Sequence, residues 1–196
     1  MQIGVLALQG AFIEHEKVLK RLGCQVVQVK KAEHLNNLGG LIIPGGESTT
    51  IGKLMNEFLL TDRIRELATQ GMPVFGTCAG LILMAKDIVA SDQPRLGLMN
   101  IVAHRNAFGR QVDSFETDLE INGLGQPFKA VFIRAPYIKE VKNGVEVLAT
   151  VNDRIVLAKE KNLLAAAFHP ELTEDTRIHQ LFLEEVESFE KNNKSM

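Results

Sequence analysis

Short apolar runs alternate with amphipathic helical stretches through the first half of this chain. The strand-like runs are residues 3–8, 25–29, 40–43 and 73–76. The clearest helical stretch carries apolar side chains at i, i+3, i+4, i+7 and i+8, namely Ile51, Leu54, Met55, Phe58 and Leu59. Strand and helix in alternation are typical of a parallel sheet with helices on both faces. We therefore expect an α/β fold with an open, mostly parallel sheet.

Turn residues and apolar periodicity divide the rest of the chain. Further helices are expected over residues 61–71, with Thr61 as N-cap, and over residues 79–86 and 173–191. Residues 100–159 contain short strand-like segments between Asn-Gly, Gly-Gln-Pro and Asn-Asp turns, which predicts a β-rich extension of the same sheet. The sequence contains no repeat and no long linker. We expect one domain over residues 1–196.

Charge and cysteine content exclude several classes of protein. Lys plus Arg number 22 and Asp plus Glu number 24, so the net charge of −2 argues against a nucleic-acid binder and against a polybasic membrane binder. The two cysteines cannot form a disulfide framework, and no Cys/His spacing suggests a zinc site. The first ten residues lack the basic start of a signal peptide, and no apolar run is long enough to span a membrane. A cytoplasmic protein with reduced thiols is expected.

Residues 73–83, PVFGTCAGLIL, place a cysteine between a strand and a helix. Gly76 precedes Cys78 by two positions and Gly80 follows it by two, which gives the nucleophile-elbow pattern with cysteine in place of serine. The glycines let the backbone turn where side chains would collide. The helix N-terminus favours thiolate over thiol, and the N–H group of Ala79 points to where an oxyanion would form.

A free cysteine is more often a small buried core residue than a nucleophile. The flanking glycines at a strand-to-helix junction reverse that preference for Cys78. Cys24 has no such surroundings, and we expect it in the core or at the surface.

A thiolate nucleophile needs a general acid and base, and His169 is the histidine best placed to serve. It follows the apolar run 163–168 and opens His-Pro-Glu. Because a residue before proline stays extended, and residues i and i+2 of an extended segment point the same way, Glu171 is expected beside the imidazole. Of the other four, His15 and His179 are expected on solvated helix faces, His34 in a polar loop and His104 at a strand end.

The segment LIIPGGESTT, residues 41–50, ends a strand with two glycines whose backbone N–H groups can receive an oxyanion. A phosphate loop is the competing interpretation, because Gly40 and Gly45 have its glycine spacing. Gly46 and Glu47 stand where that loop requires Lys and Ser/Thr, so we exclude it. The other alternative is a plain turn in which Ser48 caps the next helix, and this is compatible with oxyanion binding.

Taken together, the cysteine elbow, the Gly-Gly turn and the His-Pro-Glu segment resemble the class I, triad-type glutamine amidotransferases, which implies a flavodoxin-like fold. Within that family the chain is similar, over almost its whole length, to the glutaminase subunits of pyridoxal 5′-phosphate synthase. The similar segments are IGVLALQGAFIEH, LIIPGGESTT, FGTCAGLILMAK, RNAFGRQVDSFE, VFIRAP and FHPELTEDTRIHQLF. Many class I members carry glutamine four residues after the nucleophile, where this chain has Ile82. That difference removes one usual contact but fits the narrower family.

The resemblance implies a role for each matching residue. Cys78 is the nucleophile, and His169 and Glu171 complete the triad. The residues implied to line the glutamine site are Gly46, Glu47, Ser48, Arg105, Ile133 and Arg134. Gly46 is also implied to contact the oxyanion, through a backbone able to rearrange. Without the resemblance, Arg105 and Arg134 are carboxylate clamps at best and surface ion-pair residues more often.

The resulting hypothesis is hydrolysis of L-glutamine to glutamate and ammonia through a glutamyl thioester, with no metal or organic cofactor. The resemblance implies a (β/α)8-barrel synthase subunit as the partner that receives the ammonia and activates the glutaminase. The LQGAF segment, residues 8–12, and the loops around the Gly-Gly turn are the expected docking face. Two alternatives remain: a cysteine peptidase or γ-glutamyl hydrolase on the same scaffold, and a scaffold subunit that has lost the chemistry.

Overall fold

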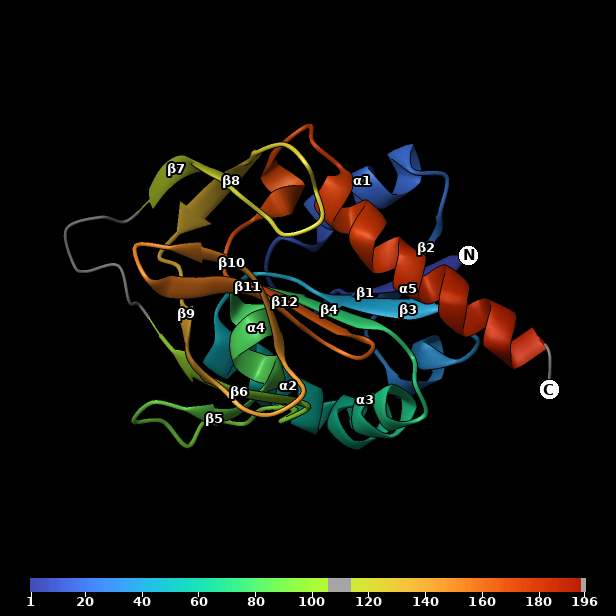
Figure 1. Ribbon diagram of the computed structural model, residues 1–196. Coiled ribbons are helices and arrows are strands. Elements are labelled where there is room, and N and C mark those ends of the chain that lie inside the picture. Colours follow the sequence, from blue (N-terminus) through green and yellow to red (C-terminus); the bar gives the residue numbers. More distant parts are fainter. Residues whose placement is uncertain (106–113, 195–196) are drawn as a thin grey trace.

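One large mixed sheet forms the centre of the protein, in a computed structural model that describes residues 1–105 and 114–194 (Figure 1). The strands are β1 (Gln2–Leu6), β2 (Gln25–Val29), β3 (Gly40–Ile43), β4 (Val74–Thr77), β5 (Ala85–Ile88), β6 (Met99–His104), β7 (Ser114–Leu119), β8 (Phe128–Ile133), β9 (Tyr137–Val141), β10 (Glu146–Val151), β11 (Arg154–Glu160) and β12 (Leu163–Ala166). Along the sheet they run in the order β2-β1-β3-β4-β12-β11-β9-β6-β5, and β10 pairs with β11.

The first five strands of that order are parallel, which confirms the predicted parallel sheet. Three adjacent strands of this parallel part, β3, β4 and β12, are buried at every position. Burial on both faces explains why these strands are continuous apolar runs in the sequence and not alternating patterns. β4 lies between β3 and β12, so Cys78 and His169 both follow strands at the middle of the sheet.

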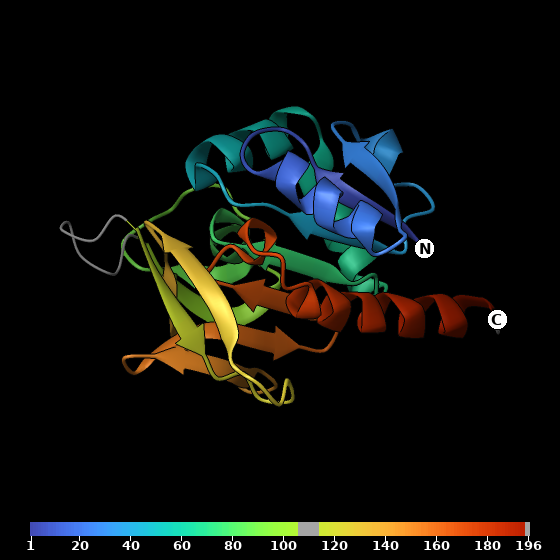
Figure 2. The same cartoon turned by 90° about the horizontal axis from the view of Figure 1, so that it is seen from above.

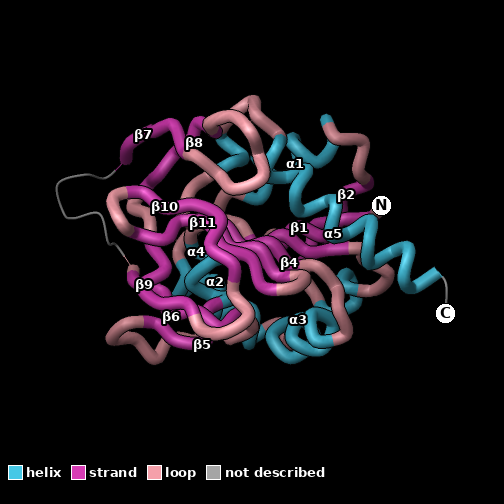
Figure 3. The backbone as a smooth tube through the Cα atoms, viewed as in Figure 1, coloured by secondary structure: helices cyan, strands magenta, loops and turns pink. Residues whose placement is uncertain are grey.

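Helices cover both faces of this parallel part. Figure 1 shows α1 (Phe12–Arg21) and α5 (Arg177–Lys194) on one side, with α2 (Ser48–Glu57), α3 (Leu60–Thr69) and α4 (Ala79–Met84) on the other. Two short 3-10 helices, η1 (Ala32–Leu35) and η2 (Pro170–Leu172), complete the helical segments. Both termini lie at the same end of the molecule (Figure 3), where β1 begins. The carboxyl ends of the parallel strands, where ligands bind in such sheets, lie at the other end.

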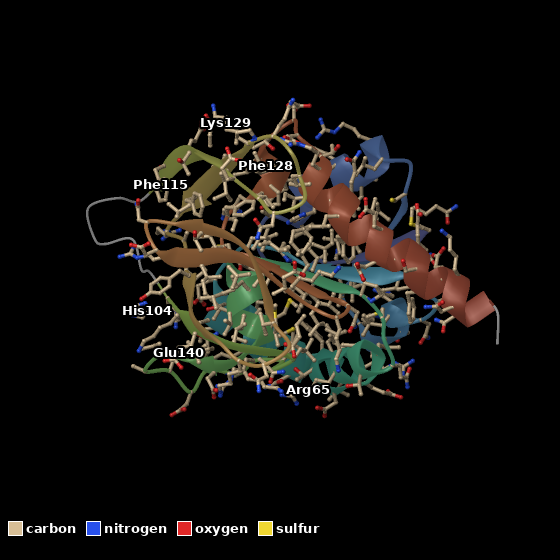
Figure 4. The ribbon with its side chains drawn as sticks, viewed as in Figure 1. Arg65, His104, Phe115, Phe128, Lys129 and Glu140 are labelled. Carbon is tan, nitrogen blue, oxygen red and sulfur yellow. The ribbon has the colours of Figure 1, made fainter. Side chains whose placement is uncertain are left out.

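The predicted β-rich extension is confirmed for most of its strands, since β11, β9 and β6 continue the large sheet beyond β12 and β10 pairs with β11. Strands β7 and β8 differ, because they pair only with each other as a separate antiparallel sheet (Figure 2). Phe128 of this hairpin, labelled in Figure 4, packs against Phe168 with ring centroids 5.7 Å apart. The backbone N–H of His169 donates to the carbonyl of Val131 in β8 at 2.8 Å. The hairpin therefore helps to hold His169 in place.

Three predicted boundaries are wrong. Thr61 lies inside α3, whose N-cap is Leu59 in the left-handed region with φ of +57°, and the Thr61 hydroxyl bonds Asn56 Oδ1 at 2.5 Å. The helix after Cys78 ends at Met84, because the chain turns at once into β5. The last helix begins at Arg177, after the turn of η2. Each error concerns the end of a helix, which the local chain conformation decides and which apolar periodicity specifies only to within a few residues. No described helix has the length and apolar character needed to cross a membrane.

Candidate active site

Cys78 occupies a strained corner between β4 and α4. Its φ and ψ of 49° and −101° lie outside the regions that side-chain-bearing residues ordinarily adopt. The corner is held from behind, since the Cys78 backbone N–H donates to the carbonyl of Ala166 in β12 at 2.8 Å. Ala79 is the first residue of α4, where backbone N–H groups have no acceptor within the helix. This is the geometry of a nucleophile elbow.

The two glycines of the elbow are required by close approach. A Cβ atom on Gly76 would lie 2.6 Å from the Gly80 backbone, and one on Gly80 would lie 2.1 Å from the carbonyl oxygen of Ile43 in β3. Any larger residue would push α4 away from the sheet. The prediction that these positions must be glycine is confirmed, with backbone contact as the reason.

His169 lies just past the end of β12, and its ring faces Cys78 from the neighbouring strand. The two side chains line one cavity, and a Cβ atom on Gly45 would meet His169 Cε1 at 2.4 Å and Cys78 Cβ at 3.4 Å. His169 Nδ1 lies 2.7 Å from Oε1 of Glu171, whose side chain is fully buried. The Cys–His–Glu arrangement predicted from the sequence is therefore present as geometry.

Glu171 reaches His169 by a different local route from the predicted one. Residues 170–172 form the 3-10 turn η2, with Pro170 at its first position, and not an extended segment. His169 itself remains non-helical, with φ of −108° and ψ of 84°, as expected for a residue before proline. The turn brings the carboxylate back toward the ring, so the predicted contact forms although the predicted backbone does not.

Charge around the triad favours a protonated imidazole. Burial by itself would lower the pKa of His169, but its interactions with Cys78 and Glu171 outweigh burial and raise the pKa to about 10. Burial would raise the pKa of Glu171, but its interactions with His15 and His169 outweigh burial and lower that pKa. The ring is thus poised to donate a proton at neutral pH, with an ionised carboxylate behind it.

A cavity of about 440 Å³ opens in front of this triad, a volume suited to a small metabolite. It is lined by Gln9, Gly10, Ala11, Gly45, Gly46, Glu47, Ser48, Cys78, Ala79, Ile82, Arg105, Ile133, Arg134, His169 and Leu172. Every predicted site residue except Glu171, which lies behind His169, is in this set. The structure therefore brings together residues from the elbow, the Gly-Gly turn, the end of β6 and the end of β8.

The Gly-Gly turn is tied to the N-terminal segment. The carbonyl of Gly45 accepts the Ala11 backbone N–H at 3.0 Å, and the side-chain oxygen of Gln9 accepts the Glu47 backbone N–H at 2.8 Å. A Cβ atom on Gly10 would lie 1.9 Å from the Gly45 oxygen, so the two segments are in direct backbone contact. Gly46 has φ of +159°, close to extended backbone. The orientation of this turn thus depends on residues 9–11.

Glu47, and not Ser48, caps α2. The carboxylate of Glu47 accepts the backbone N–H groups of Thr49 at 3.1 Å and Thr50 at 2.7 Å. Burial would raise the pKa of Glu47, but these hydrogen bonds outweigh it and lower the pKa to about 2. Ser48 instead points inward and donates to Gln93 Oε1 at 3.2 Å. The predicted Ser48 cap is therefore wrong. The Glu47 carboxylate, on a longer side chain, accepts two backbone N–H groups and takes the capping role instead.

Arg105 is positioned by two side chains. Its Nη1 donates to Gln93 Oε1 at 2.9 Å, and its Nη2 lies 3.7 Å from Glu47 Oε1. Arg134 is exposed at the cavity rim with φ of +42°, and the carbonyl of Ile133 faces the Cys78 sulfur at 4.0 Å. Residues 106–113, which carry most of the RNAFGRQVDSFE segment, lie outside the described residues.

A second hollow lies beside α3. An open groove of about 1110 Å³ runs between α3 and residues 93–98, and its described lining includes neither cysteine nor histidine. Arg65, labelled in Figure 4 on α3, is held there by backbone carbonyls of Arg95 and Leu96. Within residues 1–105 and 114–194, no cluster of three metal-ligating side chains is found.

The SNO glutamine amidotransferase family matches this chain over residues 5–188. The chain belongs to that family. This glutamine amidotransferase is 63% identical over 187 residues to the pyridoxal 5′-phosphate synthase subunit PdxT of Moorella thermoacetica, covering 95% of this chain and all of that protein. It is 60% identical to the subunit of the same name from Carboxydothermus hydrogenoformans, covering 95% and 98% of the two chains.

Solved structures agree with the family assignment. A crystal structure described as a glutamine amidotransferase matches with a TM-score of 0.91 at 54% identity, covering 94% of this chain and 98% of that one. A putative GMP synthase subunit from Thermoplasma acidophilum matches with a TM-score of 0.71 at 16% identity, over 99% and 98% of the two chains. The second match shows the shared fold alone. The predicted fold class is confirmed.

Three residues at the site are absent from the sequence-based prediction. Gln93 joins Ser48 to Arg105, and nothing in the polar stretch around it points to that role. His15 and His179 were expected on solvated faces, yet both are completely buried behind Glu171. Their signal is periodicity: His15 lies three residues before Val18, and His179 three before Phe182, so both share an apolar helix face.

Proposed function

We propose that this amidotransferase releases ammonia from L-glutamine by acyl transfer to Cys78 and delivers it to a (β/α)8-barrel synthase subunit that makes pyridoxal 5′-phosphate. The carrying observation is that Cys78 and His169 line one cavity while Glu171 Oε1 lies 2.7 Å from His169 Nδ1 behind it. The overall activity follows the family and the relatives named pyridoxal 5′-phosphate synthase subunit. The whole chain acts in this proposal as one cytoplasmic domain.

The reaction begins with attack of the Cys78 thiolate on the side-chain amide carbon of glutamine. The carbonyl π electrons move to oxygen, and the backbone N–H groups of Ala79 and Gly46 stabilise the oxyanion. A proton from His169 goes to the amide nitrogen, and the C–N bond breaks to release ammonia and leave the glutamyl thioester. His169, now neutral, takes a proton from water, the hydroxide attacks the thioester, and glutamate leaves as the thiolate is restored.

Substrate orientation falls to the polar rim of the cavity. Arg105 is held by Gln93 and Glu47 and presents a guanidinium suited to the substrate α-carboxylate. The ionised Glu47 is available for the α-ammonium group at the same end. Ile133, Arg134 and Ser48 complete the wall opposite the elbow. This division leaves the amide end of glutamine against Cys78.

The docking face for the synthase subunit is proposed around residues 8–12. Two hydrogen bonds connect this segment to the Gly-Gly turn, so a partner that moves Gln9 or Ala11 also moves Gly45 and Glu47. Ile13 of α1 is 50% exposed and Leu172 of η2 is 45% exposed, so both elements present apolar surface that a partner would cover. A partner docked there acts on the oxyanion region through these hydrogen bonds. We therefore expect the glutaminase activity to be weak until the complex forms.

The test is ammonia release from L-glutamine by this chain, alone and with a synthase-type barrel subunit, with Cys78→Ala in parallel. We expect activation by the partner and complete loss of turnover in Cys78→Ala. Calorimetry should show that this variant still binds glutamine. A glutamyl peptide and a poly-γ-glutamate substrate complete the panel. Turnover of those substrates without turnover of glutamine would favour the hydrolase alternatives. No turnover of any substrate in a demonstrated complex would favour a scaffold role.

A further inference from the structure

A cluster of buried polar side chains lies on the far side of the triad carboxylate. His15 comes from α1, His179 from α5 and Thr77 from the end of β4, and none of the three is exposed to solvent. His15 Nδ1 lies 3.0 Å from His179 Nε2, and His15 Nε2 lies 3.1 Å from Thr77 Oγ1 and 3.4 Å from Glu171 Oε2. The mechanism above uses none of these groups. Three elements converge on a carboxylate that already serves His169 with its other oxygen.

Oε2 of Glu171 needs a partner. It is buried and makes no well-formed hydrogen bond within the described part of the chain, and the group that faces it is the Nε2 edge of His15. An unpaired buried carboxylate oxygen is costly, so a donor aimed at it has a large effect on where the carboxylate sits. A small rotation of either side chain would shorten the 3.4 Å separation to a full hydrogen bond.

The contacts of the two histidines select one pair of tautomers. Burial lowers the pKa of His15, and it lowers the pKa of His179 to about 3, so both rings are neutral at pH 7. If His179 carries its proton on Nε2, it donates to His15 Nδ1, which leaves His15 with Nε2–H facing Glu171 and Thr77. The opposite pair would bury an N–H on His179 Nδ1, which has no hydrogen-bond partner among residues 1–105 and 114–194, and would aim a lone pair of His15 at the carboxylate.

We propose that His15 and His179 are a positioning pair for the triad: the Nε2–H group of His15 is aimed at Oε2 of Glu171, and His179 fixes the tautomer of His15. The pair holds Glu171 with Oε1 toward His169 Nδ1 and stabilises its ionised form. The line of contacts then runs from Cys78 through His169, Glu171 and His15 to His179. The inference rests on the proposed function only in assigning these residues to the same triad.

Other charged groups also face this cluster. Glu14 of α1 and His169 lie close enough to affect His15, and Arg21 affects His179. Arg21 is itself paired with Glu174 at the surface. His169 contacts Glu171 through Oε1, whereas Glu14 and Arg21 act on the two buried histidines electrostatically.

The variants separate positioning from packing. His15→Leu removes the donor, whereas His15→Gln places an amide N–H at about the position of Nε2. Thr77→Val removes the competing hydroxyl at nearly constant volume. His34→Gln is the matched control, because His34 lies in η1 and the one described hydrogen bond of its side chain is from the Lys30 backbone N–H. Thermal unfolding of each variant identifies those that fold as the wild type does.

Two readouts are specific to positioning. The first is the pH profile of Cys78 alkylation by iodoacetamide, followed on the peptide that carries Cys78 because Cys24 is also free. In His15→Leu we expect its acid limb to move to higher pH by about one unit, since a less stabilised Glu171 supports the His169 cation less well. The second is glutaminase kinetics of the complex, where kcat falls roughly 10- to 100-fold with KM unchanged, as for loss of a hydrogen bond to a charged group.

The expected pattern is loss in His15→Leu, recovery of most of the rate in His15→Gln, and no change in His34→Gln. A folded His15→Leu with wild-type profile and kcat would overturn the proposal. A Thr77→Val variant with the same loss of kcat as His15→Leu would also overturn it, because the important contact of His15 Nε2–H would then be with Thr77 and not with Glu171. If wild-type protein in complex releases no ammonia while the His15→Leu alkylation profile still shifts, the proposed function fails and the positioning pair stands.

A measurement on the unmodified chain covers the case in which His15→Leu does not fold. Nitrogen-15 NMR of labelled histidines reports the tautomer and charge of each ring. We expect neutral Nε2–H tautomers for His15 and His179 at pH 7. An Nδ1–H tautomer or a protonated ring for His15 would overturn the proposal, because His15 Nδ1 could then not accept a hydrogen bond from His179.

Discussion

Glu171 separates two groups of histidine that the fold treats in opposite ways. On the cavity side, His169 faces a thiol and a carboxylate, and its pKa is raised to about 10. On the core side, His15 and His179 are buried against Phe75 and each other, and burial lowers the pKa of both. Histidine therefore serves in two states around Glu171: His169 is a proton donor beside Oε1, and His15 is a neutral hydrogen-bonding group beside Oε2.

The difference shows that burial alone does not decide the state of a histidine. His169 is 7% exposed and His179 is 0% exposed, so both are buried residues. What separates them is the partner: His169 interacts with the Glu171 carboxylate and with Cys78, whereas His179 faces the neutral ring of His15 with one nitrogen and no hydrogen-bonding group of the described residues with the other. A partner of opposite charge outweighs desolvation, and a neutral partner does not.

The largest effect is expected when the cavity-side histidine is removed. His169→Asn should lower kcat for ammonia release roughly 10,000-fold, as loss of the orienting and proton-transferring groups of a triad does. Steady-state assay of the complex measures it, with circular dichroism as the test of folding. A variant that keeps even a tenth of the wild-type kcat would mean that another group transfers the proton.

A smaller loss is expected when His169 is displaced without being changed. Gly45→Ala places a methyl group 2.4 Å from His169 Cε1, and kcat should fall roughly 100-fold, as for a reacting group moved by about 1 Å. Gly97→Ala is the control, because its new methyl meets no heavy atom within 4 Å, although φ is +64° there. Equal activity of the two variants would show that the imidazole has more room than the structure gives it.

Substrate binding should separate from the triad altogether. Arg105→Gln is expected to raise KM for glutamine roughly 10-fold with kcat near wild type, because it removes a charge-assisted contact to the substrate and leaves both histidine groups in place. Arg65→Gln, on α3 and away from the cavity, should leave both constants unchanged. A fall in kcat alone for Arg105→Gln would move Arg105 from binding to chemistry.

The smallest effect is a change in how stability depends on pH. His179 binds a proton in the unfolded chain below its ordinary pKa of 6.5 but resists it in the fold until about pH 3. The unfolded state therefore binds more protons between those values, and the free energy of unfolding should fall as pH falls from 7 to 5. His179→Leu should reduce that fall in urea unfolding measured above the range where Glu171 titrates. An unchanged slope would mean that His179 is protonated in the fold.

Local sequence patterns predicted much of this protein. The strands before Pro44 and Cys78 are recognisable because burial on both faces makes them uninterrupted apolar runs. The elbow is recognisable because only glycine tolerates backbone at 2.1 Å from its Cβ position, as at Gly80. The prediction failed where long-range contacts decide, as at the solvated faces expected for His15 and His179.

What the sequence by itself determined is the order of strands and helices along the chain, the cysteine at the elbow and the histidine–carboxylate pair two residues apart. Each of these is encoded within a window of a few residues, through periodicity, turn chemistry and spacing. Only the tertiary structure decided that His15 and His179, 164 positions apart, meet behind Glu171 and that Gln93 joins Ser48 to Arg105. Such contacts depend on how helices and loops from distant parts of the chain pack against each other on the sheet, which no local pattern specifies.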